Sequence, residues 1–218
     1  LCAVLAGEVR TADFRKGAGE EDGHPGAESD GEDDVAGCRE EEPSGTKVLG
    51  PGGAMETMEA AKKEGKIRYI GFSVHSQETA VAAMHRYPFD TVLFPVNFVL
   101  FSQAKFGPQI LATAQEKKMG ILALKAMAKT TWPAAEKKNH PEPKCWYQPA
   151  AYPNEAALGL RWTLGHPITA ALPPGDEKYF RLAMDVAQNY KPLEKHEEVA
   201  LLSGAVGAEP IFHLGNDV

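Results

Sequence analysis

A lysine inside an apolar run is the residue of this sequence whose setting most clearly suggests chemistry. Lys125 lies in the segment ILALKAM (residues 121–127), in which every other side chain is apolar. Burying an unpaired ammonium group costs several kcal/mol, so a lysine is seldom placed in such a run for packing. The run therefore predicts a strand whose Lys125 side chain points into a binding site.

A second candidate is a turn that precedes a helix near the end of the chain. Pro174 and Gly175 follow an apolar strand, and the next residues predict a helix that begins near Asp176. Free backbone N–H groups at a helix N-terminus attract anions. The carboxylates of Asp176 and Glu177 oppose an anion there, so the residues alone leave this site open.

No pattern of cysteine or histidine predicts a metal site. Cys2, Cys38 and Cys145 form no CxxC pair, and the seven histidines form no HxxxH or HExxH motif. The same cysteines lack the spacing of a disulfide framework, which favours reduced thiols and a cytoplasmic location. No apolar run reaches the ~18 residues of a membrane span.

The acidic charge of the chain belongs to its first 46 residues. Residues 1–46 hold 13 acidic and 4 basic residues, whereas residues 47–218 hold 17 acidic and 19 basic residues. Between residues 16 and 45 the one large aliphatic residue is Val35, so little apolar surface is available to offset the entropy of ordering. We therefore expect residues 1–46 to be disordered. A solvated tail, a partner-binding segment and a mistranslated or frameshifted start are the alternative explanations of this segment.

After residue 47, strand and helix signals alternate. The expected strands are residues 67–72, 90–98, 121–127 and 168–172, and the expected helices are residues 52–65, 76–86, 110–120, 154–166, 176–189 and 193–203. A long loop of residues 128–153 is expected to be functional or mobile. Nearly continuous apolar strands, each followed by a helix, indicate an α/β fold whose parallel sheet is covered on both faces. Periodicity leaves an open doubly wound sheet and part of a barrel as alternatives, although no GxGxxG or GxxxxGKS/T motif supports the first.

Four sequence blocks carry a resemblance to a known family. They are AAKKEGKIRYIGFSVHS (residues 60–76), FDTVLFPVNFV (89–99), KKMGILALKAM (117–127) and ALGLRWTLGHPITAALPPG (157–175). In this order and spacing they resemble strands five to eight of an aldo/keto reductase. The resemblance implies a (β/α)8 TIM-barrel type of fold, present in residues 47–218 as a partial (half) barrel, and hence a truncated enzyme.

The resemblance also implies an active site that this chain holds only in part. In the family, NADPH delivers a hydride to a carbonyl, and a Tyr supported by Lys, Asp and His from the first four strands donates the proton. Residues 1–46 contain no Tyr, and His24, Asp13 and Asp22 follow no apolar strand. We therefore expect no catalytic residue in this chain. Loss of the general acid or base alone lowers a rate by about 10²- to 10⁴-fold.

The remaining half is similar to the part of the family that binds the nicotinamide cofactor. Ser73 and His75 match the polar pair at the carboxamide, although His75 stands one place later than the usual Asn. Asn97 matches a Pro-x-Asn after strand six, whereas Leu93 departs from the Gln of many relatives. A surface-loop histidine and a strand-end cap are the alternative interpretations of His75 and Asn97. The loop and helix start after strand eight match the contacts to the phosphates. The expected cofactor-binding residues are Ser73, His75, Asn97, Lys125, Pro174, Gly175 and Lys178.

Two functional hypotheses follow from the sequence. The first is an aldo/keto reductase-type oxidoreductase that uses NADP, with NAD as the alternative, and a small carbonyl substrate, but is inactive as this chain. The second is a non-enzymatic nucleotide- or protein-binding module derived from the same barrel. A near-neutral matched region without a basic patch argues against nucleic acid for both. Exposed edges of a half barrel predict self-association.

Overall fold

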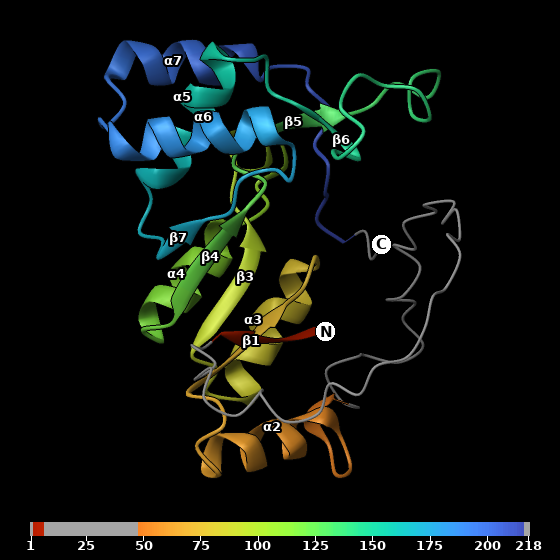
Figure 1. Ribbon diagram of the computed structural model, residues 1–218, viewed down its shortest axis with the longest axis vertical. Helices are drawn as coiled ribbons and strands as arrows, with labels where there is room; N and C mark the ends of the chain where they lie inside the picture. Colours follow the sequence, from red (N-terminus) through yellow and green to blue (C-terminus); the bar gives the residue numbers. More distant parts are fainter. Residues whose placement is uncertain (1, 7–47, 216–218) are drawn as a thin grey trace, which may run out of the picture.

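The protein is built on a five-stranded sheet. The structure, a computed structural model, describes residues 2–6 and 48–215. The strand order is β1-β2-β3-β4-β7 (Figure 1). The strands are β1 (Cys2–Ala6), β2 (Tyr69–Ser73), β3 (Thr91–Pro95), β4 (Gly120–Leu124) and β7 (Ala170–Ala171). The last four are parallel to one another, which confirms the predicted α/β class.

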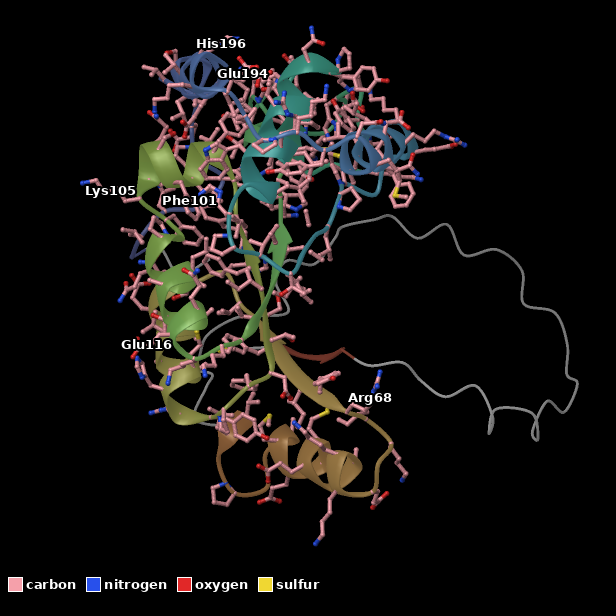
Figure 2. The ribbon with its side chains drawn as sticks, turned by 90° about the vertical axis from the view of Figure 1, so that its left-hand side faces the viewer. Arg68, Phe101, Lys105, Glu116, Glu194 and His196 are labelled. Atoms are coloured by element: carbon pink, nitrogen blue, oxygen red, sulfur yellow. The ribbon has the colours of Figure 1, made fainter. Side chains whose placement is uncertain are left out.

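Helices lie on one face and at both ends of this sheet. They are α2 (Ala54–Lys63), α3 (Gln77–Arg86), the π-helix η2 (Leu100–Ala104), α4 (Pro108–Glu116), α5 (Asn154–Leu164), α6 (Glu177–Gln188) and α7 (Lys195–Gly204). In Figure 2, α3 and α4 lie along the same side of the strands. In Figure 1, α2 lies at the lower end, whereas β3 and β4 run upward toward α5, α6 and α7. The carboxyl ends of the parallel strands therefore face α5, α6 and α7.

Local signals in the sequence explain where two of the helices begin or end. Ser76 precedes α3, and its Oγ accepts a hydrogen bond from the Thr79 N–H at 3.2 Å, which is the expected N-cap. Gly65 follows α2 with a φ of 72°, a left-handed conformation that glycine adopts without strain. The predicted end of the next helix at Gly120 is wrong, because α4 ends at Glu116. Gly120 instead opens β4, where an added Cβ would lie 3.0 Å from Cγ2 of Thr91.

One face of the sheet is covered and the other is partly open. In β3, Val92 and Phe94 are fully buried, whereas Leu93 between them is half-buried. In β4, Leu122 is likewise half-buried, and it lies directly opposite Leu93 in the β3–β4 register. The prediction of two covered faces is therefore wrong. Continuous apolar residues indicated burial on both sides, but the described helices α3 and α4 lie on only one of them.

A strand lies at the start of the segment that was expected to be disordered. Cys2–Ala6 form β1, which pairs with β2 in antiparallel register from Cys2 opposite Ser73 to Ala6 opposite Tyr69. This run carries no charge and can pair with the otherwise free edge of β2, whereas the expectation of disorder was drawn from the acidic composition that follows it. Residues 7–47 lie outside the described residues, so the expectation for them stays a prediction.

The segment expected to be one long loop contains a two-stranded sheet. β5 (Ala128–Thr131) pairs with β6 (Tyr147–Pro149) in antiparallel register, with an irregularity between Ala128 and Thr130. The backbone N–H of Ala150 donates to the carbonyl of Met127 at 2.8 Å, which attaches this small sheet to the segment that follows β4. The sheet of β5 and β6 therefore lies close to the carboxyl end of β4 (Figure 1).

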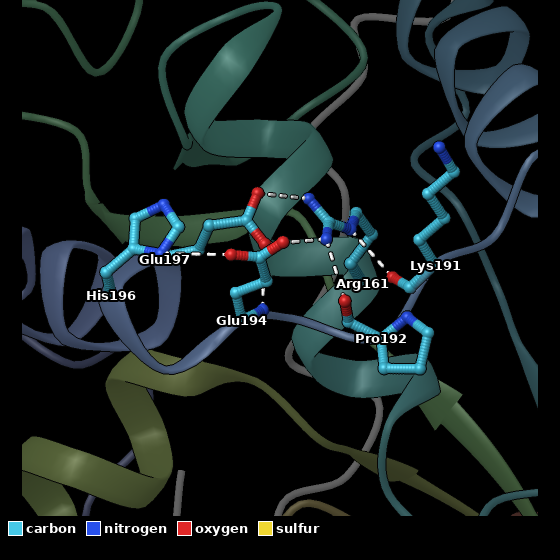
Figure 3. A network of polar contacts seen from close by, with 6 residues as sticks. All are labelled: Arg161, Lys191, Pro192, Glu194, His196 and Glu197. Carbon is cyan, nitrogen blue, oxygen red and sulfur yellow. Dashed lines mark hydrogen bonds and ion pairs between the residues drawn. The ribbon is translucent and has the colours of Figure 1, made fainter.

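A charged network attaches α7 to α5 (Figure 3). Both terminal nitrogens of Arg161 donate to the carboxylate of Glu197, each at 2.7 Å, and its Nε donates to the carbonyl of Lys191 at 2.9 Å. Glu197 also accepts from the backbone N–H of Glu194, which closes a capping box at the start of α7. Hydrogen bonds from Arg161 hold the pKa of Glu197 at about 2. The paired charges thus fix the helices beyond the carboxyl ends of the strands.

Candidate functional site

All seven residues expected to bind a cofactor lie at the carboxyl end of the parallel strands. Ser73 is the last residue of β2, Asn97 follows β3 by two residues, and Lys125 directly follows β4. His75 lies two residues beyond Ser73. Pro174, Gly175 and Lys178 follow β7 and include the first turn of α6. Because these strands are parallel and neighbouring, their carboxyl ends meet at one end of the sheet, where ligands bind in parallel α/β folds.

Lys125 lies at the centre of this group. Its side chain is half-buried, and its Nζ lies 4.6 Å from the ring centroid of Tyr147 and 4.9 Å from that of Trp146. Its backbone adopts a φ of 64°, an uncommon left-handed conformation for a residue with a side chain. Burial lowers the pKa of Lys125 because the ammonium form loses hydration. Lys125 therefore lies beneath two aromatic rings, and the expectation that its side chain points into a binding site stays a prediction.

Asn97 fixes the backbone around Lys125. Its side chain is 1% exposed, and its Nδ2 donates to the carbonyl oxygens of Lys125 at 3.1 Å and of Ala128 at 2.8 Å. Its Oδ1 accepts from the Leu100 N–H at 2.8 Å. Both amide hydrogens are therefore engaged with backbone, and the one atom with spare capacity is the acceptor Oδ1. This geometry favours the interpretation of Asn97 as a residue that positions the β4–β5 connection.

Ser73 and His75 lie at the carboxyl end of β2, and β3 separates them from Lys125. Ser73 is half-buried and pairs in register with Leu93 of β3. His75 is exposed overall, yet its ring lies against Phe212, with centroids 4.9 Å apart. Burial of the ring and the nearby charge of Lys125 together lower the pKa of His75, because both disfavour the imidazolium. His75 thus presents a neutral imidazole near the Lys125 amine at neutral pH.

The turn before α6 has carboxylates where a phosphate would need positive charge. Asp176 caps α6, and its Oδ1 accepts from the Lys178 N–H at 3.0 Å. The Nζ of Lys178 forms an ion pair with Glu142 from the β5–β6 connection. Pro174 is buried and Gly175 is exposed, with nothing within 4 Å of the place where a Cβ would stand. An anion at this turn would therefore have to displace Asp176 or Glu142.

The β5–β6 connection brings to the site a group of side chains whose contacts there were not predicted from the sequence. Cys145 is fully buried and hydrogen-bonds to Tyr147, and burial raises the pKa of its thiol to about 11. Glu142 is 7% exposed, and its Oε2 has no hydrogen-bond partner among the described residues. Trp146 is 45% exposed and covers Lys125. The length of the loop predicted a functional or mobile segment, but no local pattern indicated these partners.

Other parts of the described chain hold fewer side chains that could bind a ligand or a metal ion. A cavity of about 690 Å³ lies at the opposite end of the sheet, beside Tyr69 at the start of β2 and Asp90 before β3. Asp90 there pairs with Lys62 at 2.7 Å. Within residues 2–6 and 48–215, no three His, Cys, Asp or Glu side chains group in a way that could hold a metal ion. The carboxyl end of the sheet therefore remains the candidate site.

One family model matches most of the described chain. The model of the aldo/keto reductase family matches residues 51–201. A solved structure of the thermostable aldo-keto reductase Tm1743 with the inhibitor epalrestat is 19% identical over 68% of this chain and 52% of its own, with a TM-score of 0.45. Aldose reductase from Giardia lamblia is 10% identical over 72% of this chain and 51% of its own, with a TM-score of 0.47.

A third similar structure is the holo form of the aldo-keto reductase AKR11C1 from Bacillus halodurans. It is 18% identical over 72% of this chain and 57% of its own, with a TM-score of 0.46. The chain therefore spans about half the length of the solved structures it matches. No curated protein matches it in sequence.

Proposed function

Because this chain belongs to the aldo/keto reductase family and its sheet is part of a (β/α)8 barrel, we propose that residues 47–218 are the cofactor-binding half of an NADP-dependent oxidoreductase. In this proposal the chain binds a nicotinamide dinucleotide weakly and does not turn over a carbonyl substrate by itself. The observation that carries it is the position of Ser73, Asn97 and Lys125 at the carboxyl ends of three neighbouring parallel strands.

The residues present fit the nicotinamide end of the cofactor better than its phosphate end. At the nicotinamide end, the Lys125 ammonium has no carboxylate partner in the described part of the chain, and Ser73 lies across β3 from it. At the phosphate end, Lys178 is paired with Glu142 and the helix N-terminus is capped by Asp176. A bound cofactor would supply the hydride for reduction. The cofactor phosphates must first displace Glu142 from Lys178 or Asp176 from the helix N-terminus. Because this displacement costs free energy, the proposed binding is weak.

Titration of NADPH fluorescence against the purified chain tests the binding proposal. We expect saturable binding, and Lys125→Ala should weaken it about tenfold, because one charge-assisted contact contributes roughly 1.4 kcal/mol. Lys66→Ala is the matched control, since Lys66 lies near the amino end of β2 and its ammonium pairs with exposed Glu64. Equal affinities for both variants, or no saturable binding at all, would rule out the proposed site. NADH in place of NADPH tests the preference for NADP that the family suggests.

The open face of the sheet supports self-association with a second copy of the chain. Leu93 and Leu122 lie opposite each other on that face and are half-buried, although leucines are usually inside. Sedimentation velocity should show a dimer whose population rises with concentration, and Leu122→Lys should shift it toward monomer. Val199→Lys, on an exposed apolar residue of α7, is the control. If the wild-type chain is a monomer at every concentration, the proposed self-association is wrong.

The cysteine pattern supports a cytoplasmic location, which fractionation of cells that express the chain would test. No described helix is long and apolar enough to cross a membrane.

A further inference from the structure

Lys125 lies at the carboxyl end of β4 and has no acidic partner among the described residues. In residues 2–6 and 48–215, its Nζ forms no ion pair, whereas the nearby Lys129 pairs with Glu155 at 2.7 Å and Lys178 pairs with Glu142. Two hydrogen bonds to its carbonyl, from Asn97 and from the Ala128 N–H at 2.9 Å, fix the backbone that presents the side chain. Among the described residues, Lys125 is therefore a positioned lysine whose charge no carboxylate neutralises.

The surroundings of Lys125 favour an amine that can lose its proton. The rings of Trp146 and Tyr147 cover one side of the Nζ, and such rings attract an ammonium ion. Burial opposes them and lowers the pKa of Lys125, and the nearby Cys145 offsets this lowering only in part. His75, whose pKa the same ammonium lowers, is a neutral base near it. Burial without a counter-ion is the usual way in which a lysine becomes nucleophilic.

We propose that Lys125 is a nucleophilic amine that captures small aldehydes as an imine at the carboxyl end of β4. The nitrogen lone pair attacks the carbonyl carbon, and the carbonyl oxygen takes up the proton that the nitrogen releases, which gives a carbinolamine. The hydroxyl then leaves as water while the C=N bond forms, so no oxidant or reductant takes part. The capture needs no dinucleotide, and it can therefore succeed or fail independently of NADPH binding.

Reductive trapping of an aldehyde tests this inference. The full chain is incubated with propanal and sodium cyanoborohydride near neutral pH, and the propylated lysines are identified by peptide mass mapping. We expect Lys125 to be modified on the order of tenfold faster than the exposed Lys137 and Lys138. Lys125→Arg, which keeps a cation beneath the rings, should remove the fast modification.

The control for this experiment is Lys129→Arg. That variant changes a lysine four residues away which is already paired, so the fast modification of Lys125 should remain. Thermal unfolding of both variants shows whether each is folded. Should Lys125→Arg fail to fold, the wild-type rates at Lys125 and Lys137 decide alone. Uniform labelling of all lysines, or fast labelling that survives in folded Lys125→Arg, would overturn the proposal.

Discussion

Replacement of Asn97 by Ala is expected to lower the free energy of unfolding by about 3 kcal/mol or more. The side chain is almost fully buried, and its loss leaves the carbonyl of Ala128 and the N–H of Leu100 without this partner. Each buried polar group left unsatisfied costs about 1 to 3 kcal/mol. Urea unfolding followed by tryptophan fluorescence measures the change. Asn139→Ala is the control, because Asn139 is exposed and should shift stability by less than about 0.5 kcal/mol.

Asn97→Ala also shows whether Asn97 positions the backbone of Lys125 or contacts a ligand itself. If Asn97 acts through the backbone of Lys125, the fast trapping of propanal at Lys125 should slow in Asn97→Ala wherever the variant remains folded. If Asn97 instead contacts a cofactor directly, NADPH affinity should fall while the trapping of propanal at Lys125 keeps the wild-type rate. A stable Asn97→Ala protein with wild-type trapping would contradict the positioning role.

The order of the elements could be predicted because their signals are local. Ser76 caps α3 through its own first turn, and Gly65 follows α2 in the left-handed conformation that suits glycine. The apolar run alone placed Lys125 inside a strand of residues 121–127, and its position at a strand end came from the family resemblance. The resemblance likewise placed Ser73 and Asn97 after strands, and because parallel strands share one direction, all three lie at the same end of the sheet.

Features that depend on distant partners could not be predicted in this way. Thr131 pairs with Tyr147 across a connection rich in Pro and Lys, and neither strand has an alternating pattern long enough to be recognised. Glu142 meets Lys178 from 36 residues away. β1 required a free edge of β2 that the composition of residues 1–46 did not reveal. The amide of Asn97, with partners 28 and 31 residues along the chain, is a similar case.

The purified chain is expected to oxidise NADPH no faster than the buffer blank with any aldehyde in a broad panel. Reduction of a carbonyl needs a general acid whose pKa lies near the working pH, and its absence alone lowers a rate by about 10²- to 10⁴-fold. Two buried tyrosines near the site, Tyr147 and Tyr179, do not meet this need. Burial raises the pKa of Tyr147, whose side chain already hydrogen-bonds to Cys145, and burial raises the pKa of Tyr179 to about 12.

The position of Tyr69 excludes it as the proton donor, and a variant of Tyr147 tests the strongest remaining candidate. Tyr69 lies at the amino end of β2, at the opposite end of the sheet from Lys125. Tyr147 does lie beside Lys125, but the lysine faces its ring, and the net effect of its surroundings is to disfavour the phenolate. Tyr147→Phe should therefore leave NADPH oxidation at the blank level. A wild-type rate above the blank that Tyr147→Phe removes would assign the proton donor to Tyr147, and binding and catalysis would then reside in the same half of the barrel.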